Sequence, residues 1–332
     1  MKINFEHRMS AHCENGVISN LLRYYGIELS EPMVFGIGSG IYFSYLPFYK
    51  LNGMPVTSFR PWPGLIFKRI TRALNIEMHS QRFRDPERAM QELNNNLNKG
   101  IPTGMVVGVF HLTYFPAPYR FHFNAHNIVA FGQENGEYLI SDPVMENTER
   151  LSAFDLKRVR FSGGIAKPKG KMYYIKSVPE HVDIESAIRK GLKRTVLEML
   201  KLPGPIIGIT GIKYLGSRIR KWPSKLGERK AGQYLGQIVR MQEEIGTGGA
   251  GFRFLFAAFL QEASEKLAIP ALNELSMEMT KVGDQWREFA VKAGRIYKGR
   301  HSTETYDELS DFLIKIAENE KKVYQGIDKA IR

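Results

Sequence analysis

Apolar and polar residues follow two different patterns along the chain, and the change comes near residue 178. Before that point, short apolar runs with β-strand character are separated by turn residues, as at residues 104–110, 127–131 and 137–140. Asn135-Gly136 separates the last two runs and suits a tight hairpin turn. We therefore expect residues 127–131 and 137–140 to be adjacent antiparallel strands.

Helical patterns precede these strands. They cover residues 14–25, 64–74 and 86–97. Asp85 is the expected N-cap of the third helix, with Pro86 at its first helical position. The first part of the chain is thus predicted to be helices followed by a sheet.

After Val178-Pro179 the pattern becomes helical throughout. The predicted helices cover residues 183–201, 227–245, 250–267, 271–298 and 303–330. In the last of these, apolar residues recur at spacings of three and four, which is one face of an amphipathic helix. Residues 202–224, rich in Gly and Pro and carrying Trp222, are expected to be a surface connection, a mobile flap, a carrier-docking loop or a membrane-touching segment.

The patterns predict an α+β fold in two domains. Residues 1–178 form a domain of helices plus an antiparallel sheet, and residues 179–332 form an all-α domain. A length of 332 residues is consistent with two domains. No apolar run approaches the length of a membrane span, and the opening residues lack the apolar core of a signal peptide, so we expect a cytoplasmic protein without stable membrane insertion.

The net charge of +13 is spread over both halves. Residues 1–178 carry 21 basic and 14 acidic side chains, and residues 179–332 carry 26 and 20. A diffuse excess of this kind favours encounter with an acidic macromolecule or leaves only a solvated basic surface. Because the basic residues are dispersed and no nucleic-acid-binding motif is present, a non-catalytic module that binds nucleic acid or membrane is disfavoured.

The chain has a single cysteine, Cys13, which excludes an internal disulfide and any multi-cysteine metal site. Cys13 stands at the start of the first predicted helix. There the helix dipole and the backbone N–H groups lower a thiol pKa and can hold an oxyanion, so Cys13 is a candidate nucleophile that we expect to be accessible from a cleft. The alternative is a buried structural cysteine.

A thiolate nucleophile needs a base, and His126 is the best placed of the eight histidines. His126 begins one strand of the predicted hairpin, and Asp142 follows the other. Paired antiparallel strands can bring the two side chains together, so that Asp142 orients the imidazole of His126. Cysteine at a helix start, then histidine and aspartate on neighbouring strands, is the order of the papain-like fold.

Several segments resemble the butirosin biosynthesis protein H family. They are His12-Cys13-Glu14, the helix end at residues 20–26, residues 29–40 with Phe43, and His126-Asn127-Ile128-Val129. Residues 246–253 and 259–263 are similar to the helical domain that often accompanies it. The resemblance implies a papain-like N-terminal domain akin to bacteriocin-processing cysteine peptidases. It also implies transfer of an acyl group from an acyl carrier protein thioester to an amine, with Cys13 as nucleophile, His126 as base and Asp142 as orienting acid.

One departure concerns the oxyanion. Papain-like peptidases carry a glutamine a few residues before the cysteine, whereas residues 6–12 here contain none. The donor is therefore open, with the backbone N–H of Cys13 and a side chain such as His7 or Asn20 as candidates. His12 is either a residue that stabilises the thiolate or a structural one.

Four further residues are candidates for substrate binding. Glu31 and the glycine-rich residues 36–40 are expected to pass close under the active-site helix, and the pattern only weakly indicates a phosphate-binding loop. Tyr42 belongs to an aromatic set at residues 35–49 that either lines an acyl channel or forms core. The helical domain is expected to close over the Cys13 cleft, with Arg253 and Glu262 as its polar candidates there. Dimerisation is the alternative role for that domain.

The leading hypothesis is an acyltransferase that uses no metal and no cofactor. Its partners are an acyl carrier protein and a small-molecule amine, and a homodimer stays open. The alternative enzyme is a cysteine hydrolase, a peptidase or thioesterase that uses the same three residues with water as acceptor. Pocket shape and desolvation distinguish transfer from hydrolysis, and neither follows from the sequence.

Overall fold

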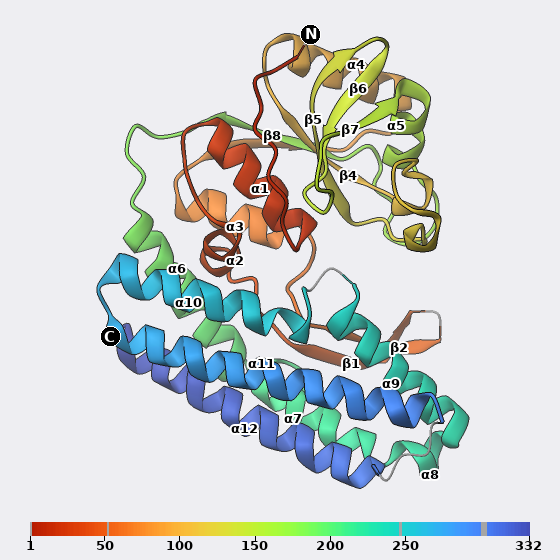
Figure 1. Cartoon of the computed structure of the whole chain (residues 1–332), viewed down its shortest axis with the longest axis vertical. Coiled ribbons are helices and arrows are strands. Elements are labelled where there is room, and N and C mark those ends of the chain that lie inside the picture. The colour runs from red at the N-terminus through yellow and green to blue at the C-terminus, as the bar shows by residue number, and fades with distance from the viewer. Residues whose placement is uncertain (1, 52, 246–247, 300–303) are drawn as a thin grey trace. The chain divides into compact units, whose positions relative to one another are not determined.

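Two units make up the structure, a computed structural model that describes residues 2–51, 53–245, 248–299 and 304–332 (Figure 1). Met1–Val34 and Ile70–Val182 form the first unit. Phe35–Arg69 and Asp183–Arg332 form the second. The predicted α+β class is confirmed, since helices and an antiparallel sheet precede a long helical region. Residues 35–69, which lie before the predicted boundary at 178, associate with the C-terminal helices.

The first unit is built around a six-stranded antiparallel sheet with strand order β3-β8-β4-β5-β6-β7. Its strands are β3 (Glu77–Gln81), β4 (Thr103–Val107), β5 (His126–Glu134), β6 (Glu137–Ser141), β7 (Glu149–Ser152) and β8 (Met172–Ser177). The predicted hairpin is present as β5 and β6, with Asn135 and Gly136 both at positive φ in the turn. Its other short elements are the 3₁₀ turns η1 (Val109–His111) and η2 (Ala117–Tyr119).

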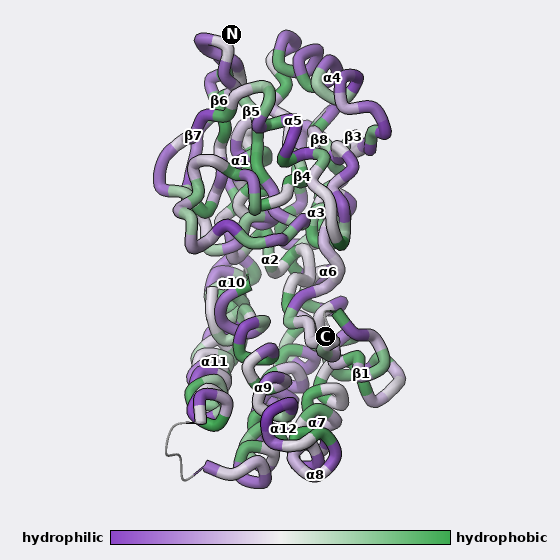
Figure 2. Tube along the Cα trace, turned by 90° about the vertical axis from the view of Figure 1, so that its right-hand side faces the viewer, coloured by the Kyte–Doolittle hydropathy of each residue, from purple (hydrophilic) through white to green (hydrophobic). Residues whose placement is uncertain are grey.

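Three helices of this unit pack on the sheet. They are α1 (Cys13–Tyr24), which contacts β5, and α4 (Pro86–Asn98) and α5 (Ala153–Arg160), which both contact β4. As predicted, Asp85 caps α4 by accepting the N–H of Glu87 at 2.9 Å. Figure 2 shows apolar residues along β5 and a largely hydrophilic α4. The centre of the sheet is therefore buried, and α4 presents polar residues to solvent.

The second unit holds the C-terminal helices and the two-stranded sheet β1-β2. The strands are β1 (Ser44–Leu51) and β2 (Met54–Ser58). The helices are α6 (Ile184–Val196), the π-helical turn η3 (Leu197–Lys201), α7 (Gly208–Ile219), α8 (Trp222–Leu226), α9 (Glu228–Glu243), the 3₁₀ turn η4 (Ala250–Phe252), α10 (Arg253–Leu267), α11 (Pro270–Tyr297) and α12 (Tyr306–Ala330). Two short helices, α2 (Glu31–Ile37) and α3 (Leu65–Ala73), span the points where the chain passes between the units.

Aromatic packing explains why residues 35–69 belong to the second unit. Phe43 and Phe59 are buried, and their rings lie 6.1 and 5.4 Å from the ring of Trp286 on α11. Gly36 lies so close to Phe259 of α10 that a Cβ atom would overlap its ring. The glycine-rich residues 36–40 thus serve close packing against the helices of this unit. Their expected passage under the active-site helix stays a prediction, because that helix belongs to the first unit.

Residues 202–224 are not a loop, contrary to the prediction. Most of the segment forms α7 and α8, and α7 packs along α12. Gly216 lies against Ile314 and the carbonyl oxygen of Ser310, so a small residue is needed at this helix crossing. The glycines that suggested a connection therefore permit two helix backbones to approach closely.

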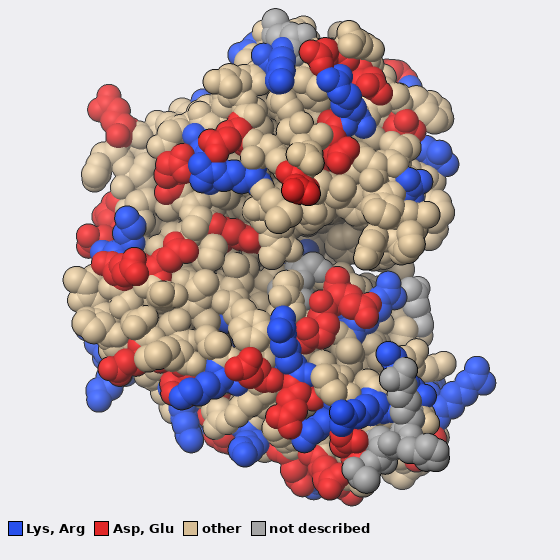
Figure 3. Space-filling model, in the orientation of Figure 1, with Lys and Arg blue, Asp and Glu red and all other residues tan. Residues whose placement is uncertain are grey.

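No helix in the described ranges combines the length and the apolarity needed to cross a membrane. On the face drawn in Figure 3, Lys and Arg side chains are interspersed with Asp and Glu. The basic excess of the sequence is thus dispersed on this face.

Candidate active site

Cys13 is the first residue of α1, as the sequence predicted. It is buried, with 7% of the residue exposed, so the expected access from a cleft is not seen. The preceding residue, His12, is the N-cap and has an extended backbone. The carboxylate of Glu31 holds the two residues that precede the helix, because its two oxygens accept the N–H groups of Ala11 and His12 at 2.8 Å each. Burial raises the pKa of Glu31, and these two backbone bonds oppose that shift.

Gly16, one turn into α1, lets the segment that follows β6 pack against the helix. A Cβ atom at Gly16 would lie 2.4 Å from Cβ of Pro143 and 2.7 Å from Cβ of Ser10. The Ser10 N–H also donates to the Pro143 carbonyl oxygen at 2.6 Å. The missing side chain therefore lets the segment after Asp142 pack directly on the helix that carries Cys13.

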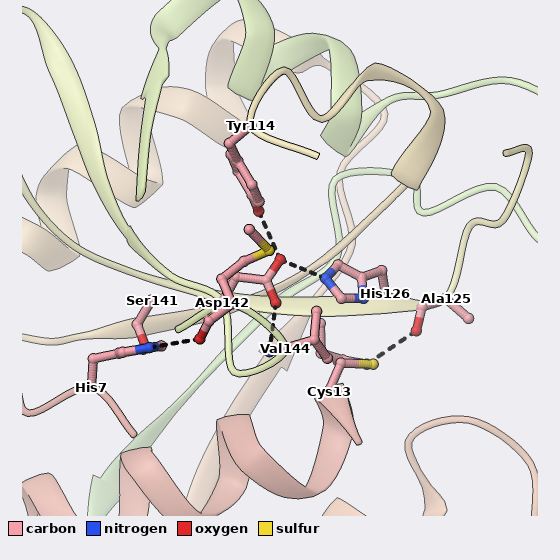
Figure 4. Close-up of polar contacts among 10 residues, drawn as sticks. His7, Cys13, Tyr114, Ala125, His126, Ser141, Asp142 and Val144 are labelled. Carbon is pink, nitrogen blue, oxygen red and sulfur yellow. Dashed lines mark hydrogen bonds and ion pairs between the residues drawn. The ribbon is translucent and has the colours of Figure 1, made fainter. Parts of the chain in front are cut away.

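His126 and Asp142 lie side by side (Figure 4). Nε2 of His126 is 2.7 Å from Oδ2 of Asp142, and the exposed fractions of the two residues are 4% and 0%. The register of the hairpin, in which Val129 of β5 faces Ser141 of β6, brings the first residue of β5 near the residue after β6. With Nε2 directed at Asp142, Nδ1 is the imidazole nitrogen left to face Cys13.

Three donors converge on the Asp142 carboxylate. Besides His126, the hydroxyl of Tyr114 donates to Oδ2 at 2.8 Å, and the N–H of Val144 donates to Oδ1 at 3.2 Å. Burial and the Asp142 charge raise the pKa of Tyr114 well above 10, so its hydroxyl stays protonated and donates. Phe115, the next residue, places its ring edge-on to the imidazole with 5.5 Å between centroids.

The charges around His126 favour its protonated form. Burial lowers its pKa, but the Asp142 carboxylate, the Cys13 thiolate and the hydrogen bonds to both raise it, with a net result of about 10. A charge on Cys13 and the Asp142 carboxylate both favour a protonated imidazole between them. An imidazolium in this position favours the thiolate form of a neighbouring cysteine.

The two side chains suggested as oxyanion donors bind the protein itself. Nδ1 of His7 lies 2.8 Å from Oγ of Ser141, and Nε2 lies 3.1 Å from the carbonyl oxygen of Met145. The amide of Asn20 donates to the Arg8 carbonyl oxygen at 3.0 Å. Both residues therefore fix segments that flank the Cys13 region. His12 is 2% exposed in the same region.

Asn127, which the sequence reasoning did not single out, has its amide beside Cys13. Nδ2 lies 3.9 Å from Sγ of Cys13 and donates to the carbonyl oxygen of Ala125 at 3.1 Å. Its Oδ1 accepts the hydroxyl of Tyr173 at 2.7 Å. Tyr114 was missed as well. No periodicity distinguishes either residue from its neighbours, and both take their places through contacts distant in sequence.

Three predicted binding residues belong to the second unit. Tyr42 is half-buried beside Glu198 and Arg69, and its pKa is raised mainly by burial and then by the Glu198 charge. Glu262 is half-buried on α10. Arg253 is fully buried in an ion pair with Glu320, 2.8 Å from Nη2 to Oε1.

The aromatic and glycine-rich motifs of the second unit also have defined surroundings. Of the set proposed as channel or core, Phe35, Phe43 and Tyr45 are buried, whereas Phe48 and Tyr49 are exposed on β1. In the motif at residues 246–251, Gly246 and Thr247 lie outside the described residues, and Gly248 to Phe252 all have positive φ. In the described part of the chain, no three His, Cys, Asp or Glu side chains form a group suited to a metal ion.

Comparison with known proteins places both halves of the chain in families. Residues 12–143 match the model of the N-terminal domain of butirosin biosynthesis protein H. Residues 154–327, just over half of the chain, match a domain of unknown function, DUF4872. A search of curated proteins found no match.

A solved structure, that of a C39-like peptidase from Bacillus anthracis, is similar to part of the chain. It is 12% identical, with a TM-score of 0.37, and the match covers 54% of this chain and 100% of the other. The two family matches together span both units and include Cys13, His126 and Asp142. The chain belongs to the DUF4872 family, and its residues 12–143 belong with the N-terminal domain of butirosin biosynthesis protein H.

Proposed function

We propose that the protein is a cysteine-dependent acyltransferase that moves an acyl group from an acyl carrier protein thioester to an amine. The observation that carries the proposal is the arrangement of Cys13 at the start of α1 against the buried His126–Asp142 pair, 2.7 Å from Nε2 to Oδ2. A thiolate next to an imidazolium is suited to attack a carbonyl carbon. The match of residues 12–143 to a biosynthetic protein supports a substrate from a biosynthetic pathway.

The first half-reaction acylates Cys13. Its sulfur attacks the thioester carbonyl carbon and forms a tetrahedral intermediate. The bond between this carbon and the carrier sulfur then breaks, and the departing thiolate takes the proton from His126. The products are acyl-Cys13, a free carrier thiol and a neutral imidazole.

The second half-reaction uses the changed charge of the site. Acylation removes the thiolate charge, which is one of the contributions that raise the His126 pKa, so this pKa falls once Cys13 is acylated. The neutral imidazole accepts a proton from the attacking amine while the bond between the acyl carbon and Sγ breaks. The amide leaves, and the thiolate–imidazolium pair is restored.

The carrier protein fits the charge of this chain. Acyl carrier proteins are acidic, and this chain has a net charge of +13. Opposite net charges speed encounter, most strongly at low salt. The predicted binders of the first unit, His12, Asn20 and Glu31, stay in the proposal as groups that shape the site. The roles expected for Tyr42 and Glu262 stay predictions, and Arg253, which is fully buried against Glu320, is not part of the proposal.

The test is product analysis with a panel of acyl-loaded carrier proteins and amines. We expect an amide that forms with the natural protein and is absent with Cys13→Ala. Free acid as the sole product, also dependent on Cys13, would identify a hydrolase instead. Equal amounts of product with and without Cys13 would overturn the proposal altogether.

A further inference from the structure

The oxyanion donor of this site is missing from the place where papain-like enzymes keep it. Residues 6–12 contain no glutamine, and the two side chains suggested as donors are bound elsewhere, His7 to the loop after β6 and Asn20 to the Arg8 carbonyl oxygen. Glu31 carries negative charge and accepts backbone N–H groups. A tetrahedral intermediate on Cys13 needs a donor besides these two side chains.

We propose that the side-chain amide of Asn127 is the oxyanion donor, acting together with the backbone N–H of Cys13. Asn127 is 5% exposed, and its Nδ2 lies 3.9 Å from Sγ of Cys13. An acyl oxygen is joined to this sulfur through one carbon, so it forms within reach of a neighbouring donor, which must come within about 3 Å of the oxyanion. The Cys13 N–H belongs to the first turn of α1, where N–H groups face the helix end and favour negative charge.

Two hydrogen bonds fix which way the Asn127 amide points. The Tyr173 hydroxyl is 2.7 Å from Oδ1, and the Ala125 carbonyl oxygen is 3.1 Å from Nδ2. A carbonyl oxygen only accepts, so the atom beside Ala125 and Cys13 is the nitrogen. Burial, followed by the charges of Glu14 and Cys13, raises the Tyr173 pKa well above 10, so the hydroxyl remains a donor to Oδ1.

This geometry leaves one N–H of Asn127 for a ligand. An amide nitrogen carries two hydrogens, and the Ala125 carbonyl uses one of them. The other is on the side of the Cys13 sulfur, which is only a weak acceptor. An oxyanion is a far better acceptor, so this bond strengthens as charge develops, which is the requirement for catalysis. Tyr173 is then a positioning residue that acts through Asn127.

The experiment compares two reactions of Cys13 in the full-length protein. Acylation by p-nitrophenyl acetate forms a tetrahedral oxyanion, whereas alkylation by iodoacetamide does not. We expect Asn127→Ala to slow acylation on the order of 10²-fold and to leave alkylation within about threefold of the natural rate. Asn127→Asp, which keeps the shape but presents a carboxylate, should slow acylation at least as much.

Two further variants test whether slower acylation in Asn127→Ala merely reflects a less stable fold. Asn127→Ala leaves the buried Tyr173 hydroxyl without its acceptor, so the double variant with Tyr173→Phe removes both partners and limits the cost to folding. Asn94→Ala is the matched control. Asn94, on α4, also accepts a hydrogen bond from a tyrosine hydroxyl, that of Tyr138 at 2.7 Å. We expect Asn94→Ala to leave both reactions unchanged.

Three results would overturn the inference. They are unchanged acylation in Asn127→Ala, an equal fall of acylation and alkylation, and alkylation without any acylation of the natural protein. The inference rests on the proposed nucleophile, yet the two fail separately. If acylation of Cys13 depends on Asn127 but no amide forms from acyl-loaded carrier proteins, only the acyltransferase proposal is rejected. If amide forms equally well with Asn127→Ala, only the role of Asn127 as oxyanion donor is rejected.

Discussion

Among the described residues, Asp142 of the first unit and Glu320 of the second are fully buried carboxylates that each receive hydrogen bonds from three residues. In the first unit, Asp142 accepts from His126, Tyr114 and the N–H of Val144. In the second, Glu320 accepts from three side chains: Arg253 at 2.8 Å, Trp286 at 3.0 Å and Tyr324 at 2.9 Å. Both carboxylates are 0% exposed, and burial followed by the carboxylate charge raises the pKa of each tyrosine well above 10.

The Asp142 cluster and the Glu320 cluster, each made of the carboxylate and its three donors, differ in the cation beside the carboxylate. A guanidinium is a permanent cation in proteins, and that of Arg253 is enclosed by the rings of Trp286 and Phe59, 4.9 and 5.5 Å from their centroids. His126 can lose its proton, and its other ring nitrogen faces a thiol. Burial and hydrogen-bond number therefore do not mark a catalytic site. A titratable partner next to a nucleophile does.

Replacing the cation of each cluster, His126 or Arg253, should have the most different effects on the acylation rate of Cys13. We expect His126→Gln to lower acylation of Cys13 on the order of 10³-fold, because the imidazole that holds the thiolate and transfers the proton is lost. Arg253→Met should change the intrinsic rate of the folded protein little. Stopped-flow acylation with an activated ester measures both, and similar losses in the two variants would refute the distinction.

Glu320→Ala should cause the largest loss of stability. It leaves the guanidinium of Arg253 buried without its carboxylate, and breaking a buried pair in this way costs about 3–5 kcal/mol. Denaturant unfolding measures the change. Glu318→Ala is the control on the same helix, since its ion pair with Lys213 is exposed and we expect little effect. Equal losses in both variants would contradict the structural role of the Glu320 cluster.

The pH dependence of alkylation should reveal the raised pKa of His126. Since that pKa is about 10, the imidazolium persists as pH rises through neutrality and is lost only near pH 10. We expect iodoacetamide to label Cys13 at a nearly constant rate from about pH 6.5 to pH 9. In His126→Gln the labelling rate should rise steeply with pH, as it does for an ordinary thiol. At pH 6 the labelling rate of this variant should be on the order of 10²-fold lower than that of the natural protein. Parallel profiles would speak against the ion pair.

Tyr114→Phe should have the smallest effect. The change removes one of the donors to Asp142 and keeps the ring, so His126 and Val144 still hold the carboxylate. We expect acylation to slow about 3- to 10-fold. Tyr119→Phe, an exposed tyrosine of the same loop, is the control and should leave the rate unchanged. A loss as large as that of His126→Gln would mean that Tyr114 takes part in proton transfer itself.

Local signals predicted the elements that carry the candidate triad. The Asn135-Gly136 turn predicted the hairpin that joins His126 to Asp142, and Asp85-Pro86 predicted the start of α4. Tertiary contacts decided what the sequence could not predict. Gly216 is a helix-crossing residue only because α12 lies against it, and Asn127 points its amide at Cys13 only because Tyr173 holds its other end.

Intact-protein mass spectrometry after incubation with acyl-loaded carrier proteins is the decisive test for an acyl-Cys13 intermediate. We expect a mass increase equal to one acyl group on the peptide that contains Cys13. The adduct should disappear when the accepting amine is added and should never form in Cys13→Ala. An adduct that survives Cys13→Ala, or amide formation with no acyl-Cys13 detectable when the amine is withheld, would contradict this expectation.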